Sequence, residues 1–295
     1  MKAPKKPQDR FTRTWIIENA VKIIRQYNPG DLTIRALHYQ LVGIGMTNTM
    51  QHYKRVVAAM EVARWDGQVD FEAFSDLDRA MVGRTKADHT EVEEEISTAK
   101  RQIQAWMTNY GKNRWENQPY YAELFIEKKA LQNVFQDMCY NNDIALGAVK
   151  GYPSLTFLHE TAERLKNREE EGKRCVILYF GDYDPSGEDI PRSIEANLQR
   201  MGCEVEVRRF ALFESQVLEW KLPPAPAKET DSRTANWDGL GQVELDAVRP
   251  EQLKRMAQDA INTVFDQDLY DELLDQEEEE RQIYRKELKE YATGL

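Results

Sequence analysis

The sequence predicts an α/β protein, a mostly parallel sheet with flanking helices, preceded by a small winged helix-turn-helix domain. Four short apolar runs, at residues 122–126, 144–149, 175–180 and 203–210, are separated by helical patterns at 128–140, 153–166 and 186–201. This alternation is typical of parallel strands joined by covering helices. With 295 residues, 41% of them hydrophobic, the chain has enough apolar surface for a substantial core.

The N-terminal part predicts three helices joined by tight turns. Residues 14–27 carry apolar side chains at helical spacing and end at the stop signal formed by residues 28–31. Thr33 is placed to cap a second helix over residues 34–44, and a third helix is expected over residues 50–65. Residues 66–70 are expected to form a short strand or wing, which would complete a winged helix-turn-helix.

The charge distribution bears on the partner of this N-terminal part. The whole chain has a net charge of -11, which by itself argues against a nucleic-acid partner. Residues 1–64, however, contain 11 Lys and Arg against 4 Asp and Glu, whereas residues 266–295 contain 4 against 11. A basic DNA-binding module with Gln51, Lys54 and Arg55 facing DNA is one interpretation, and a helical bundle with a solvated basic face is the other.

Composition divides the chain into four parts. We expect a winged-helix DNA-binding domain at residues 1–85, a helical linker at 86–117, an α/β domain at 118–222 and a helical extension with an acidic tail at 223–295. The Pro-rich stretch at residues 222–227 interrupts regular structure, and a helix is expected from Pro250 to about Phe265. The tail beyond it predicts an exposed, charged helix.

Cellular location is predicted from what the sequence lacks. No run approaches the roughly 20 apolar residues that a membrane span needs, and the first residues lack the apolar stretch of a secretory signal. We therefore expect a cytoplasmic protein with no membrane partner. Cys139, Cys175 and Cys203 are odd in number and widely spaced, which favours buried thiols over a disulfide framework or a zinc site.

Three carboxylates follow two of the predicted strands. Glu127 comes directly after the first apolar run, and Asp182 and Asp184 come after the third, two residues apart and therefore on the same side of an extended chain. Ligand sites of parallel sheets collect at the carboxyl ends of strands. Converging carboxylates favour a cation, and Mg²⁺ prefers such oxygen ligands and acts on phosphoryl groups. The alternative is a turn in which Asp184 only caps a helix.

These motifs resemble the Toprim domain. The matching residues are Glu127-Lys128, residues 150–153 (Lys-Gly-Tyr-Pro) and residues 181–187 (Gly-Asp-Tyr-Asp-Pro-Ser-Gly). They are most similar to the Toprim variant found in the topoisomerase VI A subunit and its meiotic double-strand-break relatives. The resemblance implies that Glu127, Asp182 and Asp184 bind Mg²⁺ and that Lys150 belongs to the catalytic site. Glu188 is either an outer participant or a residue that favours the start of a helix.

The same family carries a catalytic tyrosine in its winged-helix domain, within an arginine-x-x-aromatic-tyrosine pattern. Residues 35–39 are similar to it, with His38 at the aromatic position, so Tyr39 is the candidate nucleophile. At about 100° per residue, Tyr39 lies opposite the apolar face of its helix and beside Arg35, which predicts an exposed tyrosine pointing away from its own core. Arg35 would favour the phenolate and bind the phosphodiester. A surface tyrosine that does not react is the alternative.

The resemblance implies Mg²⁺-dependent DNA strand cleavage in which Tyr39 forms a 5'-phosphotyrosyl link. It also implies a homodimer, with the tyrosine of one protomer serving the Toprim site of the other, and a separate ATPase subunit for strand passage. The chain has no Gly-x-x-x-x-Gly-Lys-Ser/Thr loop, so complete topoisomerase activity is not expected from it alone. Two alternatives stay open: a hydrolytic Toprim nuclease using water, and a non-catalytic DNA-binding or regulatory protein.

Overall fold

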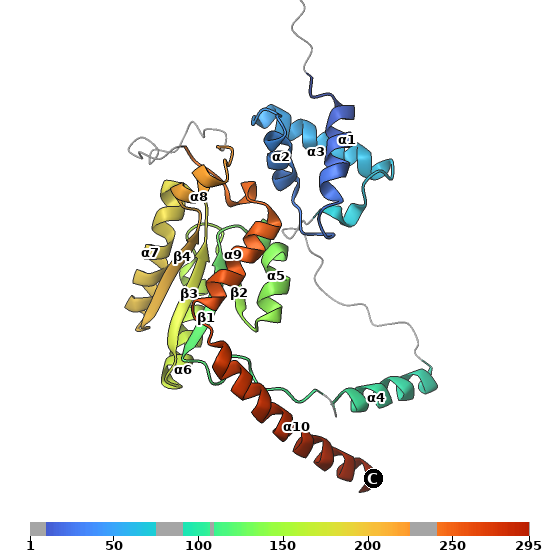
Figure 1. Cartoon of the computed structure of the whole chain (residues 1–295), viewed down its shortest axis with the longest axis vertical. Helices are drawn as coiled ribbons and strands as arrows, with labels where there is room; N and C mark the ends of the chain where they lie inside the picture. The colour runs from blue at the N-terminus through green and yellow to red at the C-terminus, as the bar shows by residue number, and fades with distance from the viewer. Residues whose placement is uncertain (1–9, 75–90, 107–108, 225–240, 295) are drawn as a thin grey trace, which may run out of the picture.

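A computed structural model describes residues 10–74, 91–106, 109–224 and 241–294 (Figure 1). The predicted domain boundary near residue 85 and residues 225–227 of the Pro-rich stretch lie outside these ranges. The chain begins with a helical part, α1 (Arg13–Ile24), α2 (Ile34–Gly43) and α3 (Met50–Trp65). A threonine hydroxyl caps the start of each helix: Thr12 for α1, Thr33 for α2 and Thr49 for α3, each accepting a backbone N–H from the first turn. The predicted Thr33 cap is confirmed.

The helical part has a core of its own, but the predicted strand at residues 66–70 is wrong. Asp66 ends α3, Gly67 reverses the chain at a φ of 68°, and Val69 is buried in the helical core. The chain then enters a single 3-10 turn, η1 (Phe71–Ala73), and Phe74 pairs with Leu32 in an isolated bridge. Because Val69 packs inward with the helices, residues 66–70 form no wing.

The predicted α/β architecture is confirmed in the second part of the chain. Strands β1 (Tyr120–Ile126), β2 (Ala145–Ala148), β3 (Arg174–Phe180) and β4 (Val205–Ala211) form a parallel sheet in the order β2-β1-β3-β4. β1 and β3 are neighbours, with Ile126 in register with Phe180. The carboxyl ends of these two strands therefore meet at one edge of the sheet.

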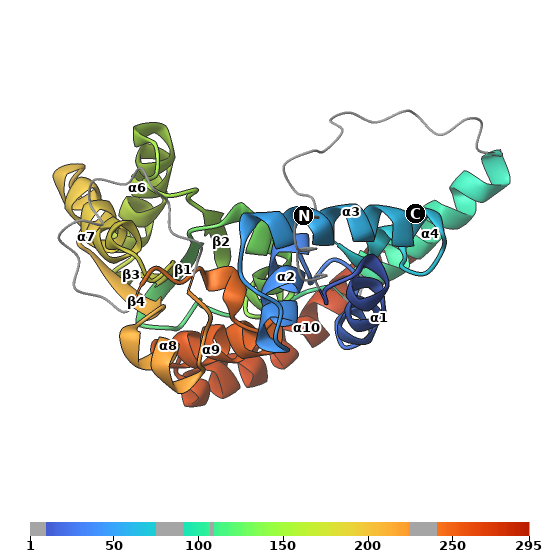
Figure 2. The same cartoon turned by 90° about the horizontal axis from the view of Figure 1, so that it is seen from above.

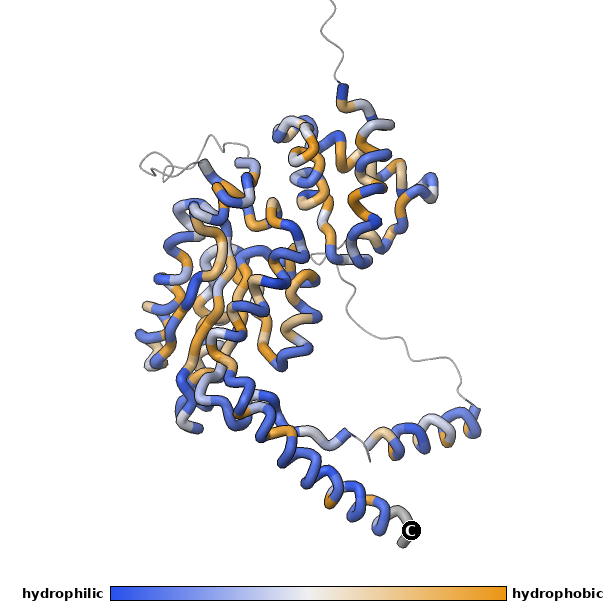
Figure 3. Tube along the Cα trace, viewed as in Figure 1, coloured by the Kyte–Doolittle hydropathy of each residue, from blue (hydrophilic) through white to orange (hydrophobic). Residues whose placement is uncertain are grey.

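Side-chain alternation builds a core on each face of the sheet. Leu124 and Leu178 pack on one face with α5 (Gln132–Asn141) and α9 (Pro250–Asn262). Phe125, Ile177 and Tyr179 pack on the other face with α6 (Leu155–Glu170) and α7 (Pro185–Arg200). Figure 2 shows the sheet between α6 and α7 on one side and α9 on the other, and Figure 3 shows hydrophobic stretches along its central strands.

The segment after the Pro-rich stretch belongs to the core on the α5 and α9 face of the sheet. Val243 forms an antiparallel bridge with Tyr183, which follows β3, and the 3-10 turn η4 (Leu245–Ala247) comes next. Val243, Leu245 and α9 contribute buried side chains to the same face as α5. Residues that the sequence assigns to a C-terminal extension thus cover the carboxyl ends of the strands, the same end at which α8 (Glu214–Glu219) follows β4 through a short turn.

Two long helices extend away from the sheet in Figure 1, α4 (Val92–Trp106) and α10 (Gln267–Gly294). α10 is mostly hydrophilic, as Figure 3 shows, which confirms the predicted charged helix. It is tied to the segment before β1, since Glu277 Oε2 accepts the Lys112 N–H at 2.7 Å and Arg281 Nε donates to the Tyr110 carbonyl at 3.1 Å. In the described part of the chain, no helix is both long and apolar enough to cross a bilayer.

The three cysteines are buried and unbridged, as predicted. Burial raises the pKa of the Cys139 thiol to about 12, so this group stays protonated and unreactive at neutral pH.

Candidate functional site

The predicted carboxylates follow β1 and β3 at the same edge of the sheet. Glu127 Oε2 accepts the backbone N–H of Asp182 at 2.9 Å and the hydroxyl of Tyr179 at 3.4 Å. Gly181 makes this approach possible, because a Cβ at that position would lie 2.8 Å from Glu127 Oε2 and 2.6 Å from the Tyr179 hydroxyl. The glycine between β3 and Asp182 is therefore required for the packing of the site.

Each of the other two carboxylates has a partner of its own. Asp182 is buried; its Oδ1 accepts the Leu245 N–H at 2.8 Å, and its Oδ2 lies 3.1 Å from Lys128 Nζ. Asp184 Oδ1 accepts the Gly187 N–H at 2.6 Å and caps α7. Within the described ranges, no three carboxylate, histidine or cysteine side chains are gathered as a ready-made metal site.

The donor set nevertheless fits Mg²⁺. Burial raises the pKa of Glu127, and the charge of Asp184 raises it further. Burial also raises the pKa of Asp182 to about 7, against the lowering effect of Lys128. Buried carboxylates that repel one another gain from a bound cation, and oxygen atoms are the ligands that Mg²⁺ prefers.

Lys128 is the cation at the centre of the site. Its Nζ lies 3.1 Å from Asp182 Oδ2, 3.2 Å from Glu244 Oε2 and 3.0 Å from Asp246 Oδ2. Burial alone would lower the pKa of the ammonium, but these three carboxylates raise it above its ordinary value. Lys128 therefore stays charged and joins the end of β3 to the segment around η4.

Tyr39 lies in the same network. Its hydroxyl donates to Glu244 Oε2 at 2.9 Å, and Arg35 binds both oxygens of that carboxylate, with Nη2 at 2.5 Å from Oε1 and Nε bonded to Oε2. Burial raises the pKa of Tyr39, and the charge of Glu244 raises it further. The phenol is therefore protonated in this arrangement.

The prediction that Tyr39 is exposed is wrong, although the predicted direction of its side chain is right. The side chain points away from the helical core, as predicted, but it is only 3% exposed and belongs to the core of the sheet domain. The segment that includes Glu244 covers it. A cavity of about 10 Å³ beside it, room for about one water, is lined by Arg35, His38, Tyr39, Asn48, Met50 and Tyr53.

The remaining predicted residues are Lys150, Glu188 and three residues of α3. Lys150 is exposed after β2 with a φ of 52°, and the cation held between the carboxylates is Lys128 instead. Glu188 is exposed in the first turn of α7, with Arg209 Nη1 3.8 Å from its Oε1. On α3, Gln51 and Lys54 are exposed, whereas Arg55 is only partly exposed.

Sequence reasoning missed Glu244 and Asp246. The signal was present, because residues 243–248 (Val-Glu-Leu-Asp-Ala-Val) place two acidic residues in an apolar run, at the same two-residue spacing as Asp182 and Asp184. Both are buried, and within the part of the chain that the structure describes, Oδ1 of Asp246 has no hydrogen-bond partner. Buried acids are costly unless cations pair with them, and here Arg35 and Lys128 do so.

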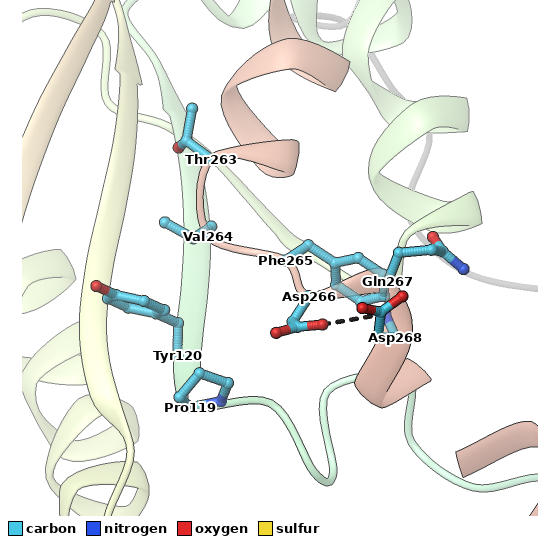
Figure 4. Close-up of a pocket in the computed structure, with 8 residues that line it drawn as sticks. All are labelled: Pro119, Tyr120, Thr263, Val264, Phe265, Asp266, Gln267 and Asp268. Carbon is cyan, nitrogen blue, oxygen red and sulfur yellow. Dashed lines mark hydrogen bonds between the residues drawn. The ribbon is translucent and has the colours of Figure 1, made fainter. Parts of the chain in front are cut away.

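A larger pocket, of about 410 Å³, lies at the other end of β1 (Figure 4). Its lining residues are Pro119, Tyr120 and residues 263–268. The hydrogen bond drawn in it joins the Asp268 N–H to Asp266 Oδ1 at 3.0 Å. Since Glu127 follows the opposite end of the strand, this pocket is separate from the candidate site.

Comparison of the chain with models of known families gives no match, and no curated protein matches it.

Proposed function

We propose that the chain is a Mg²⁺-dependent, DNA-cleaving transesterase of the topoisomerase VI A type. Tyr39 is the nucleophile, and Glu127, Asp182 and Asp184 hold the metal. One observation carries the proposal. Tyr39 and Asp182 come from different parts of the chain, yet they are joined by consecutive contacts of 2.9, 3.2 and 3.1 Å through Glu244 and Lys128. A candidate nucleophile and a candidate metal ligand thus share one buried network.

The residues of this network suit phosphodiester chemistry. The Tyr39 oxygen attacks the phosphorus and forms a 5'-phosphotyrosyl link, while the 3'-oxygen leaves. Arg35 is a planar, permanently charged group able to bind two phosphate oxygens. Mg²⁺, when bound, supplies stabilisation of the charge on the phosphate and the leaving oxygen. Gln51 and Lys54 on α3 are available to DNA, the proposed partner.

Assembly forms part of the proposal. A single site cleaves one strand, so a break in both strands needs a second copy of the chain. Strand passage, if it occurs, needs a separate ATPase subunit, because the sequence has no phosphate-binding loop of the Gly-x-x-x-x-Gly-Lys-Ser/Thr type.

A second candidate is a hydrolytic Toprim nuclease. The observation that favours it is the burial of Tyr39, whose hydroxyl donates to a carboxylate rather than facing solvent. In that case water would be the nucleophile, Glu127, Asp182 and Asp184 would hold the metal that activates it, and Tyr39 would serve only to hold Glu244.

Covalent attachment to DNA tests the proposal. Supercoiled plasmid is incubated with the protein and Mg²⁺, denatured, and assayed for strand breaks and for protein bound to DNA ends. We expect adducts with the wild type and a loss of at least about 10³-fold in Tyr39→Phe and in Asp182→Asn, since each removes an essential group. Tyr140→Phe, a change at a tyrosine that is 81% exposed, is the matched control.

The other results separate the candidates. Cleavage that survives Tyr39→Phe and leaves free DNA ends would establish the hydrolytic nuclease. DNA binding by the wild type without any Mg²⁺-dependent cleavage would contradict both enzymatic candidates.

A further inference from the structure

We propose that Glu244 is a catalytic residue of this site, which orients the Tyr39 hydroxyl and takes its proton during attack on the phosphate. The inference rests on the proposed function. Glu244 Oε2 is the acceptor of the Tyr39 hydroxyl at 2.9 Å, within the distance that a general base needs.

The position of Glu244 is fixed by the loop that carries the metal ligands. Val243, on one side of it, exchanges two backbone hydrogen bonds with Tyr183, at 2.8 and 2.9 Å. Leu245, on the other side, donates its N–H to Asp182 Oδ1 at 2.8 Å. The carboxylate is therefore held in register with the end of β3, and proton acceptor and metal site form one rigid unit.

The cations around Glu244 are those that a phosphodiester would attract. Arg35 binds both carboxylate oxygens, and Lys128 lies 3.2 Å from Oε2. Burial alone would raise the pKa of Glu244, but Lys128 and Arg35 hold it below its ordinary value. A phosphate that draws Arg35 toward itself weakens this hold, so the carboxylate becomes more basic as the substrate binds.

The proton and electron balance is simple. The O–H bond of Tyr39 breaks, and the proton passes to Glu244 Oε2. A bond forms between the tyrosine oxygen and phosphorus, and the bond from phosphorus to the 3'-oxygen breaks with its electron pair left on that oxygen, which takes a proton from solvent. Religation runs the same steps backward, with Glu244 returning the proton to Tyr39.

The test compares Glu244→Gln with Glu251→Gln, a change at an exposed acid in the first turn of α9. Single-turnover adduct formation and DNA affinity are measured on the full chain with Mg²⁺. We expect Glu244→Gln to slow adduct formation by about 10²- to 10⁴-fold, the usual range for losing a general base. DNA affinity should be unchanged or tighter, because a negative charge beside Arg35 and Lys128 is removed. Glu251→Gln should match the wild type.

Two further measurements isolate the role. Glu244→Asp keeps the charge but shortens the side chain, so it should fold and give an intermediate rate. The second measurement uses DNA in which sulfur replaces the 3'-oxygen of the scissile bond. The 3'-sulfur is a better leaving group than oxygen and depends less on a metal ion. This substrate should partly restore the rate of adduct formation by Asp182→Asn, which lacks a metal ligand. It should not restore the rate of Glu244→Gln, which lacks the proton acceptor.

The contrary outcomes are distinct. Adduct formation by Glu244→Gln at or above the wild-type rate would show that the carboxylate only covers Tyr39, and would overturn the inference while leaving the proposed function intact. A parallel loss of rate, DNA affinity and thermal stability in Glu244→Gln and Glu244→Asp would show a structural role and also overturn it. Adducts that persist in Tyr39→Phe would refute the proposed function itself.

Discussion

At the scale of single residues, the charges of the candidate site do not balance. Arg35 and Lys128 face three carboxylates, Asp182, Glu244 and Asp246, within one network of direct contacts. Buried groups of this kind are stable only when opposite charges compensate them. The excess of negative charge is a physical reason, independent of sequence resemblance, for a divalent cation to bind beside Asp182.

His38 is expected to make the protein sensitive to acid. It is buried, and within the described residues its Nε2 has no hydrogen-bond partner. Burial lowers its pKa to about 4 from an ordinary 6.5, helped by the charges of Arg35 and His52, while the Tyr53 ring packs beside it. Between pH 6.5 and pH 4, His38 is therefore protonated more fully in the unfolded chain than in the folded protein. The free energy of unfolding falls as the pH drops through this range.

The contribution of His38 is tested by measuring the free energy of urea unfolding at about pH 7 and at about pH 4.5. The unfolding free energy of the wild type should fall between about pH 7 and about pH 4.5. In His38→Phe this fall should be smaller by about 2 kcal/mol. His159→Phe, at an exposed histidine on α6, is the control and should behave as the wild type. An identical loss in all three proteins would contradict the burial of a neutral His38.

Some residues of the site could be predicted from the sequence, and others could not. Glu127 and Asp182 follow apolar runs that form neighbouring strands, so local pattern and sheet geometry together bring them close. The burial of Tyr39 depends on a distant segment, and a helical wheel describes only the helix itself. Glu244 and Asp246 follow a Pro-rich stretch, and only the pairing of Val243 with Tyr183 brings them to the site.

At the scale of elements, the start of α7 combines a structural and a chemical role in one side chain. Asp184 caps the helix, and it is also a proposed metal ligand. The turn is tight, since a Cβ on Gly187 would lie 2.2 Å from the Asp182 carbonyl oxygen. The cap thus fixes the backbone between Asp182 and the helix, and the two roles can be separated by substitution.

We expect Asp184→Asn to keep the cap and remove the charge. Asn caps helices about as well as Asp, so the unfolding free energy should change by less than about 0.5 kcal/mol, whereas Asp184→Ala should lose about 1 kcal/mol. Both should lose Mg²⁺-dependent cleavage. Ser154→Ala removes the cap of α6 and should lose similar stability with cleavage intact. Full cleavage by Asp184→Asn would exclude Asp184 as a ligand.

The elements themselves follow closely from local pattern, because the apolar runs between turn residues define the strands of the sheet. The wing is the exception. Residues 66–70 (Asp-Gly-Gln-Val-Asp) contain turn-forming residues that suit either a hairpin or the end of a helix. Packing decides between them, since Val69 completes the core between the helices.

At the scale of the whole molecule, the helical part and the sheet domain share a buried site within one chain. Tyr39 of α2 packs in the core of the sheet domain, and Lys254 Nζ lies 2.5 Å from Asp31 Oδ2 at the same junction. The resemblance to topoisomerase VI A implies a tyrosine that serves the partner protomer. The contacts of this chain instead favour a site in which Tyr39 and Asp182 act together in cis.

Mixing two inactive variants distinguishes these arrangements. Tyr39→Phe and Asp182→Asn chains, each with a different affinity tag, are produced together, and dimers that carry both tags are isolated. If the site forms in cis, each chain lacks one essential group, and the mixed dimer should nick plasmid no faster than either variant alone. If the site forms in trans, one complete site arises per mixed dimer and nicking should return, at about half the wild-type rate. Sedimentation of the untagged protein as a monomer under cleavage conditions would contradict the proposed homodimer and leave the cis site as the whole catalytic unit.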